Sequence, residues 1–413
     1  ILHTTRMTSK LKRSLNPNFN WRRWLDRGSG KKLNIRDAMA EAANKKPTSV
    51  SMQTLLDTGR GKRLPDGYDS SSIMEQERNV KNQIASFLYR EMPVRFSHRA
   101  RELARLPHGL NKQPSIKEVE NWYCESFADI VKLSPPSTEV DEAILMDTLD
   151  NIYKRHAETQ VTIAKGLREF SFSPEIQKTG KKLYEFEDIH KFLDKFSTSR
   201  IGIRMLIGQY LEIENSDPDY VGLISINTSP VDVANQAIDH ARFMCEREFG
   251  DSPMVSIRGR KDLTFAYVPS HLYYMLFELL KNSMRATCDM YMDEDGMYDG
   301  ELPDINIIIA DGEENEDVVI KVSDAGGGIR RSHVSRIFRY LFTTVRDEPT
   351  TIEDANSDFG VEGPLAGLGY GLPISRAHAR YFGGDLEIIS MEGYGTDAFL
   401  YLSRLRNHSE PLM

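Results

Sequence analysis

One stretch decides the fold: His271-Leu-Tyr-Tyr-Met-Leu-Phe-Glu278-Leu-Leu-Lys-Asn282-Ser-Met-Arg285-Ala-Thr287. Its apolar residues recur at intervals of three and four, which places them on one face of a helix. Glu278, Asn282 and Arg285 follow one another on the opposite face, at steps of about one helical turn. Such a row of polar groups can bind a ligand, but it is also typical of the solvated face of an amphipathic helix.

Two glycine-rich stretches further along the chain favour the ligand. The first is a β-branched strand that ends on Asp324 and runs into Gly326 and Gly328, where the missing Cβ atoms let the backbone pass close to a flat ligand. The second, Gly367-Leu-Gly-Tyr-Gly-Leu-Pro373, opens a helix, and free N–H groups at a helix start bind phosphate. The order of the three stretches resembles the ATP site shared by histidine kinases, DNA gyrase, Hsp90 and MutL.

Length and composition set the outer limits. A chain of 413 residues suggests two or three domains, and 40% hydrophobic residues are enough for packed cores. No run of 18 apolar residues occurs, so we expect no membrane span. A net charge of −8 argues against a general nucleic-acid binder. The three cysteines are scattered without metal-ligand spacing, which indicates structural thiols in a reducing compartment.

The first 25 residues carry Arg and Lys but no acidic residue, and they include several Ser and Thr. This composition resembles the end of a mitochondrial transit segment. The alternative is a disordered basic tail that carries no targeting signal. We expect residues 1–46 to form a flexible N-terminal segment.

Long amphipathic patterns follow, with Pro93 marking a break or kink in the first of them. Four such helices with short joints predict an antiparallel bundle over residues 47–217. The four are residues 73–106, Ser115–Val131, Asp141–Phe170 and Glu187–Glu212.

The pattern changes near Tyr220, where strands and helices begin to mix. We expect a sheet with helices on one face over residues 218–406, followed by a short tail, residues 407–413. Residues 256–257 and 264–266 are expected to pair as a hairpin. The other predicted strands are residues 221–227, 305–310, 318–323, 386–390 and 398–402, and the predicted helices are residues 230–249, 271–291 and 373–382. The fold class is therefore a helical bundle followed by an ATP-binding α/β sandwich of the gyrase and histidine-kinase type.

Several longer sequence stretches, more specific than the ATP-site motifs, resemble the mitochondrial protein kinases. This is the family of pyruvate dehydrogenase kinase and branched-chain α-ketoacid dehydrogenase kinase. The similar stretches in the second half are Phe192–Leu206, Glu278–Ala286, Ser323–Ile329, Gly369–Asp385 and Ser390–Asp397. In the first half, Pro93-Val-Arg-Phe-Ser-His-Arg-Ala, Leu106-Pro-His-Gly-Leu and Glu120-Asn-Trp-Tyr123 are similar too. The resemblance runs from about Val50 to Leu405, so it covers the helical domain as well.

This resemblance implies an ATP-dependent protein-serine kinase that phosphorylates and inactivates the E1α subunit of the mitochondrial pyruvate dehydrogenase complex. It also implies Mg²⁺, commonly K⁺, docking on the lipoyl domain of E2, a homodimer, and a place in the mitochondrial matrix. The branched-chain enzyme is the close alternative. The sequence Ser197–Arg204 is more similar to the branched-chain enzymes, whereas Leu106–Leu110 is more similar to the pyruvate branch. More distant alternatives are an ATPase of the same ATP fold and an ATP-binding adaptor without kinase activity.

Chemistry and resemblance together assign roles to individual residues. Glu278 is the expected general base and Asn282 the Mg²⁺ ligand. Asp324 is expected to accept from the adenine amino group. For Lys281, beside them, a solvated charge is the favoured interpretation. The further ATP-binding residues are expected to be Arg285, Gly326, Gly328, Thr343, Thr344, Gly367, Leu368, Gly369, Tyr370, Gly371, Leu372 and Thr396.

Two further features come from the bundle and from the central helix. The family residues that match His156 and Arg200 line a pocket for a 2-oxoacid inhibitor, and Arg204, one turn after Arg200, can add a second cation. The alternatives are a polar histidine at the bundle surface and a surface salt-bridge pair of arginines. Tyr274 stands where animal pyruvate dehydrogenase kinases carry a histidine and where the branched-chain enzymes carry tyrosine, so a His–Glu pair is not required.

Overall fold

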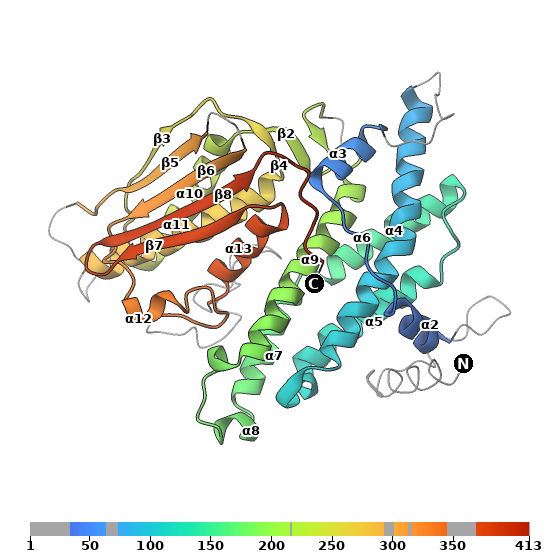
Figure 1. Ribbon diagram of the computed structural model, residues 1–413, viewed down its shortest axis with the longest axis horizontal. Helices are drawn as coiled ribbons and strands as arrows, with labels where there is room; N and C mark the ends of the chain where they lie inside the picture. Colours follow the sequence, from blue (N-terminus) through green and yellow to red (C-terminus); the bar gives the residue numbers. More distant parts are fainter. Residues whose placement is uncertain are drawn as a thin grey trace.

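The computed structural model describes residues 34–62, 73–214, 217–292, 301–312, 316–344 and 369–412. It contains a helical first half and a second half built on a sheet (Figure 1). The predicted two-domain class is therefore confirmed. The basic start of the chain lies outside the described residues. Among those that are described, no helix combines the length and the apolar character that a membrane crossing requires.

The first half packs its long helices around one apolar core, with α4, α5, α6 and α9 as the main members (Figure 1). Its elements are α2 (Ile35–Ala42), α3 (Met52–Gly59), α4 (Ile73–Leu103), η2 (Pro107–Lys112), α5 (Pro114–Val131), α6 (Glu139–Arg155), α7 (Thr159–Ser171), α8 (Pro174–Gln177), η3 (Leu183–Glu185) and α9 (Glu187–Leu211). The predicted break at Pro93 is absent, because α4 continues to Leu103. Met92 and Phe96, both fully buried beside the proline, anchor the helix to the core on either side.

The predicted helix Asp141–Phe170 is wrong, since it is two helices. α6 ends at Arg155, and α7 begins at Thr159. The carbonyl groups at the break are satisfied from α9, which the local sequence cannot reveal. Arg200 donates to the carbonyl of Ala157 at 3.1 Å, and Arg204 donates to the carbonyl of Tyr153 at 3.4 Å. A helix can end where its last carbonyls find such partners.

The second half holds two sheets. A small antiparallel sheet has the order β1-β2-β4, and the main sheet has the order β3-β5-β6-β8-β7. The pair β3-β5 is parallel, and the other neighbours in the main sheet are antiparallel. The strands are β1 (Tyr220–Val221), β2 (Ile224–Thr228), β3 (Val255–Gly259), β4 (Phe265–Tyr267), β5 (Ile305–Asp311), β6 (Asp317–Asp324), β7 (Asp385–Met391) and β8 (Gly395–Ser403). The helices are α10 (Pro230–Phe249), α11 (Pro269–Tyr291), α12 (Arg331–Val334) and α13 (Gly371–Tyr381).

The predicted hairpin of residues 256–257 with 264–266 is wrong. β3 pairs with β5 in the main sheet, whereas β4 pairs with β2 in the small one. Gly259 lets the chain turn out of the main sheet, because its φ of +90° and its close approach to the Ile309 carbonyl exclude a Cβ atom. Alternating hydrophobicity identifies a strand but not its partner.

The helices α10, α11 and α13 lie against one face of the main sheet (Figure 1). Alternate residues of β5 and β6 point to that face, and Ile307 and Ile320 are fully buried there. The other face carries exposed apolar side chains, including Ile308 on β5 and Ile389 on β7. The helix-covered face is therefore the core side of the sandwich.

The end of the chain joins the two halves, so residues 406–410 are part of the fold. The N–H of Glu410 donates to the carbonyl of Val50 at 2.9 Å. The Glu410 carboxylate pairs with Arg95 of α4 and accepts the hydroxyl of Tyr381, at the end of α13, at 2.7 Å. Gly202 of α9 makes room, since a Cβ atom there would lie 2.7 Å from a Glu410 oxygen.

We predict that Glu410→Gln lowers the free energy of unfolding by about 1.5–3 kcal/mol, because the buried Arg95 loses one of its two carboxylate partners and keeps Glu91. Urea or thermal unfolding measures the change. The matched control is Glu41→Gln, whose partner Lys45 is exposed, and the expected loss there is about 0–1 kcal/mol. Equal stability of the two variants would show that the buried pair does not hold the halves together.

Candidate nucleotide-binding and catalytic site

A cavity of about 300 Å³ lies between α10, α11, the ends of β6 and β8, and the start of α13. Most of the residues predicted for ATP binding are brought together here, although they come from separate parts of the sequence. The predicted residues on its wall are Glu278, Asn282, Arg285, Asp324, Gly326, Gly328, Thr343, Thr344, Gly369, Gly371, Leu372 and Thr396. Gly367 and Leu368 lie outside the described residues.

Glu278 is buried at the inner end of the cavity, with 2% of its surface exposed. Its Oε1 lies 2.8 Å from the Nζ of Lys281, one turn further along α11. The start of α13 lies directly over the carboxylate, because a Cβ atom on Gly371 would be 2.1 Å from Oε2. The polar row on α11 is therefore not a solvated face at this point.

Lys281 is the clearest residue that sequence reasoning placed wrongly. It is not a solvated charge, since its side chain is 16% exposed and paired with Glu278. A buried carboxylate is stable only when a partner compensates its charge. The i, i+3 spacing of Glu278 and Lys281 on one helix was a signal for this pair.

Asn282 follows on the exposed side of the cavity wall. Its amide oxygen suits Mg²⁺, which is commonly held by one or two protein oxygens together with phosphate oxygens and waters. Among the described residues, no group of three or more His, Cys, Asp and Glu could form a metal site of protein ligands alone. The donor set therefore fits a metal that arrives with a phosphate ligand.

Asp324 is held in place at the end of β6 by three donors. Its Oδ1 accepts the N–H groups of Gly326 at 3.0 Å and Thr396 at 3.2 Å, and its Oδ2 accepts the hydroxyl of Ser283 at 2.8 Å. Burial raises the pKa of this carboxyl above its usual range, and the three hydrogen bonds oppose that shift. Ser283 was missed in the sequence because it lies on the buried side of α11.

The glycines after Asp324 serve the protein's own packing. A Cβ atom on Gly326 would lie 2.7 Å from Ala286 of α11, and one on Gly328 would lie 2.1 Å from the carbonyl of Met391. Close backbone approach is therefore required here, as predicted, but its partners in this structure are α11 and the turn between β7 and β8.

Residues 341–342 and Gly369, which lie between β6 and α13, are in direct backbone contact. The N–H of Leu341 donates to the carbonyl of Gly369 at 3.1 Å, and a Cβ atom on Gly369 would collide with the backbone of Phe342. Thr343 and Thr344 continue from this clamp along the cavity wall. Tyr370 was predicted for ATP binding, but its ring is buried and contacts Tyr340 at a centroid distance of 5.7 Å.

Two more predicted positions have partners from neighbouring helices. Arg285 forms an ion pair with Glu248 of α10 and stands over the ring of Phe249. The ring of Tyr274 lies 5.2 Å from that of His378 on α13. Burial raises the pKa of Tyr274 well above its usual value, and burial lowers the pKa of His378 well below its own. Both groups are therefore neutral beside Glu278.

The three residues predicted for a 2-oxoacid pocket meet at the break between α6 and α7. His156 is 4% exposed, so the surface interpretation is wrong. Its ring lies 4.4 Å from that of Tyr123, and its Nε2 is 2.9 Å from the hydroxyl of Ser126. Burial, followed by the positive charges of nearby arginines, lowers the pKa of His156 to about 3. The imidazole is therefore neutral at pH 7.

The arginines differ from a surface salt-bridge pair as well. Arg200 is 9% exposed, and both arginines donate to carbonyls at the end of α6. Arg204 also stacks on the ring of Tyr153, with 3.9 Å between its guanidinium carbon and the ring centroid. Two guanidinium groups and a neutral histidine thus converge on one interior position of the bundle.

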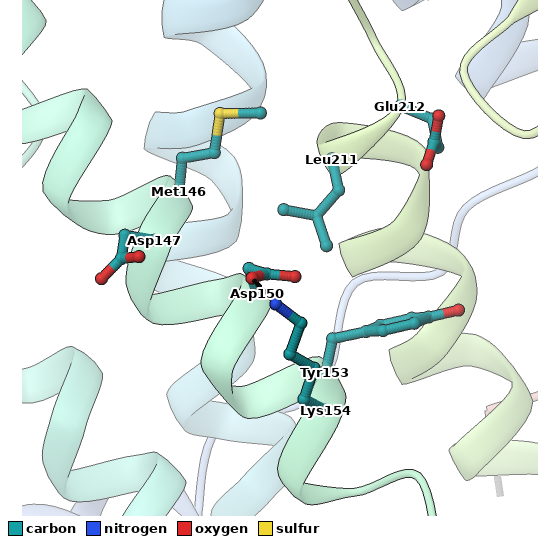
Figure 2. A pocket seen from close by; sticks show the side chains of 7 residues that line it. All are labelled: Met146, Asp147, Asp150, Tyr153, Lys154, Leu211 and Glu212. Atoms are coloured by element: carbon teal, nitrogen blue, oxygen red, sulfur yellow. Dashed lines mark hydrogen bonds and ion pairs between the residues drawn. The ribbon is translucent and has the colours of Figure 1, made fainter. Parts of the chain in front are cut away.

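A second, more open hollow lies between α6 and the end of α9 (Figure 2). Its volume is about 610 Å³. Lys154 pairs there with Asp150 at 2.6 Å, and of the predicted site residues that the structure describes, none lines it. We therefore assign no ligand to it. Its lining is Met146, Asp147, Asp150, Tyr153, Lys154, Leu211 and Glu212.

Two known families match consecutive parts of the chain. The family described as mitochondrial branched-chain alpha-ketoacid dehydrogenase kinase matches residues 49–225. The family described as histidine kinase-, DNA gyrase B- and HSP90-like ATPase matches residues 267–406.

Curated relatives extend over most of the chain. The mitochondrial [pyruvate dehydrogenase (acetyl-transferring)] kinase of Arabidopsis thaliana is 46% identical over 81% of this chain and 88% of its own length. The corresponding kinase of Ascaris suum is 37% identical over 87% of this chain and 84% of its own length. Isozyme 3 of Homo sapiens is 35% identical over 88% of this chain and 84% of its own length. The predicted resemblance is confirmed, and the chain belongs to the family of mitochondrial pyruvate dehydrogenase kinases.

Proposed function

We propose that this protein is a protein-serine kinase that uses Mg-ATP to phosphorylate, and so inactivate, the E1α subunit of the mitochondrial pyruvate dehydrogenase complex. One observation carries the proposal in a chain of this family. The buried Glu278 faces the start of α13 in a cavity whose wall also holds Asn282 and Asp324. The pyruvate branch is favoured over the branched-chain branch because the full-length relatives are named pyruvate dehydrogenase kinases.

Phosphoryl transfer depends on positioning and on neutralising charge. In our proposal Glu278 accepts the proton of the substrate serine as general base, and Lys281 holds its carboxylate in place through the 2.8 Å contact. Asn282 would hold Mg²⁺, which, when bound, neutralises charge on the phosphate oxygens. Resemblance adds K⁺ as a further cofactor.

The start of α13 is the proposed phosphate seat. No side chain caps this helix, so the N–H groups of its first turn are available to phosphate oxygens. Gly371 and Leu372 lie in that turn, beside Glu278. Thr343, Thr344 and the predicted Gly367 and Leu368 would cover the phosphates as a lid.

Adenine would bind at the other end of the cavity. We infer that Asp324 accepts the adenine amino group, because its carboxylate borders the cavity and three protein donors fix its orientation. Thr396 completes this end of the pocket. Its hydroxyl lies 3.0 Å from that of Ser390, which also accepts the N–H of Ile329 at 2.7 Å.

We propose a regulatory and docking role for residues 47–217 and a kinase role for residues 218–406. The lipoyl domain of E2 is the proposed docking partner, and the mitochondrial matrix is the proposed location. A homodimer is proposed as well, and the exposed apolar side chains of Ile308, Ile389 and Met391 on the open face of the main sheet support it. An ATPase of the same fold, or an adaptor, remains as an outcome of the tests below.

A 2-oxoacid is the proposed regulator. Arg200 and Arg204 can hold its carboxylate, and the neutral His156 can donate a hydrogen bond to its keto oxygen. Their convergence in the bundle interior supports this role. Because both arginines also bind carbonyls at the end of α6, a test must separate ligand binding from loss of structure.

Glu278→Gln should retain ATP binding and lose transfer of phosphate to E1α by about 10²–10⁴-fold, since an amide cannot accept the serine proton. Labelled ATP with purified E1 measures the transfer, and calorimetry measures the binding. The control is Glu246→Gln on α10, which does not line the cavity. Normal phosphorylation by Glu278→Gln would refute the base, and label released as free phosphate without E1 would favour an ATPase.

Asp324→Ala should weaken ATP binding by roughly 1–3 kcal/mol, because a buried donor of the base loses its acceptor. In the wild type the ionised carboxylate is the acceptor, and burial raises its pKa. Affinity should therefore fall as the pH is lowered towards that raised pKa, and Asp324→Ala should not share this dependence. Asp397→Asn, on the neighbouring strand, is the control. An unchanged ATP titration for Asp324→Ala would refute the placement.

For the substrate, pyruvate dehydrogenase E1α should be labelled faster than branched-chain E1α when each is offered with its own lipoyl domain. Docking raises the effective concentration of the acceptor near the active site, so each lipoyl domain must be present. Faster labelling of the branched-chain E1α would reverse the substrate assignment and leave the kinase itself intact.

Pyruvate should inhibit the wild type and inhibit Arg200→Ala at least several-fold less, because the variant loses one of two cations for the carboxylate. Thermal unfolding of both proteins with and without pyruvate separates binding from folding. Pyruvate should raise the melting temperature of the wild type alone. Equal inhibition and equal stabilisation of both proteins would rule the pocket out.

A further inference from the structure

Two cysteines that are far apart in the sequence meet at the wall of the nucleotide cavity. The Sγ of Cys245 on α10 lies 3.5 Å from the Sγ of Cys288 on α11. The helices run side by side against the main sheet (Figure 1). Both residues are buried, with 6% and 0% of their surfaces exposed. The sequence indicated scattered structural thiols, but the fold makes these two a pair.

The pair can be reached from the cavity. Cys245 is part of the cavity wall, and Cys288 lies directly behind it. A disulfide bond is about 2.05 Å long, so the two sulfurs need to approach by only roughly 1.5 Å. Small rotations of two side chains on neighbouring helices can supply most of that distance.

The contact between the thiols also favours reaction. The hydrogen bond between the two thiols lowers the pKa of Cys288, although burial opposes that shift, and it raises the pKa of Cys245. Thiolate is the reactive form of cysteine. The third cysteine, Cys124, lies in the core of the bundle, where burial raises the pKa of its thiol. Cys124 is therefore a matched buried thiol that should stay inert.

We propose that Cys245 and Cys288 are an oxidation site, at which hydrogen peroxide that enters the nucleotide cavity produces an intramolecular disulfide that weakens ATP binding. One sulfur attacks the peroxide, whose O–O bond breaks to give a sulfenic acid and water. The second sulfur then displaces the hydroxyl group as another water, so that two thiols and one peroxide yield one disulfide and two waters.

The effect on the nucleotide follows from what lies next to the pair. Met244 and Glu248, on either side of Cys245, line the cavity, and Arg285 lies one turn before Cys288. A disulfide would pull α10 towards α11. This movement would narrow the cavity at this wall and shift the ion pair between Glu248 and Arg285. By linkage, a bound nucleotide must oppose formation of the bond to the same extent. This consequence rests on the proposed ATP site.

The test uses the full chain, first reduced and then treated with hydrogen peroxide, with catalase ending the reaction. The wild type and Cys124→Ser should each lose about 2 Da, the mass of two hydrogens, and yield a peptide that links positions 245 and 288. Cys245→Ser and Cys288→Ser should yield no such peptide. ADP should slow the reaction, and ATP affinity should fall several-fold after oxidation and recover with dithiothreitol.

The outcomes separate the disulfide itself from its effect on ATP binding. An unchanged mass, or a disulfide that includes Cys124 or a second chain, overturns the proposal. A disulfide between Cys245 and Cys288 with unchanged ATP affinity overturns the coupling to the nucleotide. If the reduced protein binds no ATP, the proposed function fails, while the mass still reports on the disulfide. Alanine variants replace serine variants that do not fold.

Discussion

The carboxylate of Glu410 is the group on which the arrangement of the two halves depends. It lies 315 positions along the chain from Arg95, yet the two side chains are almost completely buried together. A buried charge is tolerated only with a partner of opposite sign and further hydrogen bonds, and Tyr381 and the N–H of Val50 supply those. Because Tyr381 ends α13 and the start of that helix lies over Glu278 of α11, the same contact that fixes the bundle also fixes α13 over the Glu278 carboxylate.

Local patterns predicted those parts of the fold that are determined locally. The helix Pro230–Phe249 has the bounds expected from its sequence, since Ser229 caps its start and Gly250 ends it. The break after Arg155 was missed because no glycine or proline marks it. The groups that stabilise the break, Arg200 and Arg204, lie about 50 residues further along, on α9. The wrong hairpin has the same origin, because a strand partner is a long-range choice.

The candidate site was predictable where the type and spacing of a residue already indicate its chemical role. Glu278, Asn282 and Asp324 stand out by type and spacing, and the fold brings them to one cavity. The sequence does not reveal in which direction a side chain points. Lys281 turns towards Glu278 instead of the solvent, and Tyr370 turns into the core instead of the cavity. Even the missing Cβ atom of Gly326 serves contact with α11, which no motif specifies.

The proposed 2-oxoacid pocket is connected to the candidate site in the other half through α9 and α13. The guanidinium groups that would hold a 2-oxoacid already donate to carbonyls at the break between α6 and α7, those of Ala157 and Tyr153. A bound carboxylate would compete for these donors, and the carbonyls it displaced would be left buried without partners. The cost falls on the joint between α6 and α7 and on α9, which packs against α13. Since α13 begins over Glu278, the proposed ligand in the bundle would reach the proposed catalytic residue by shifting one helix, with no direct contact between the two sites.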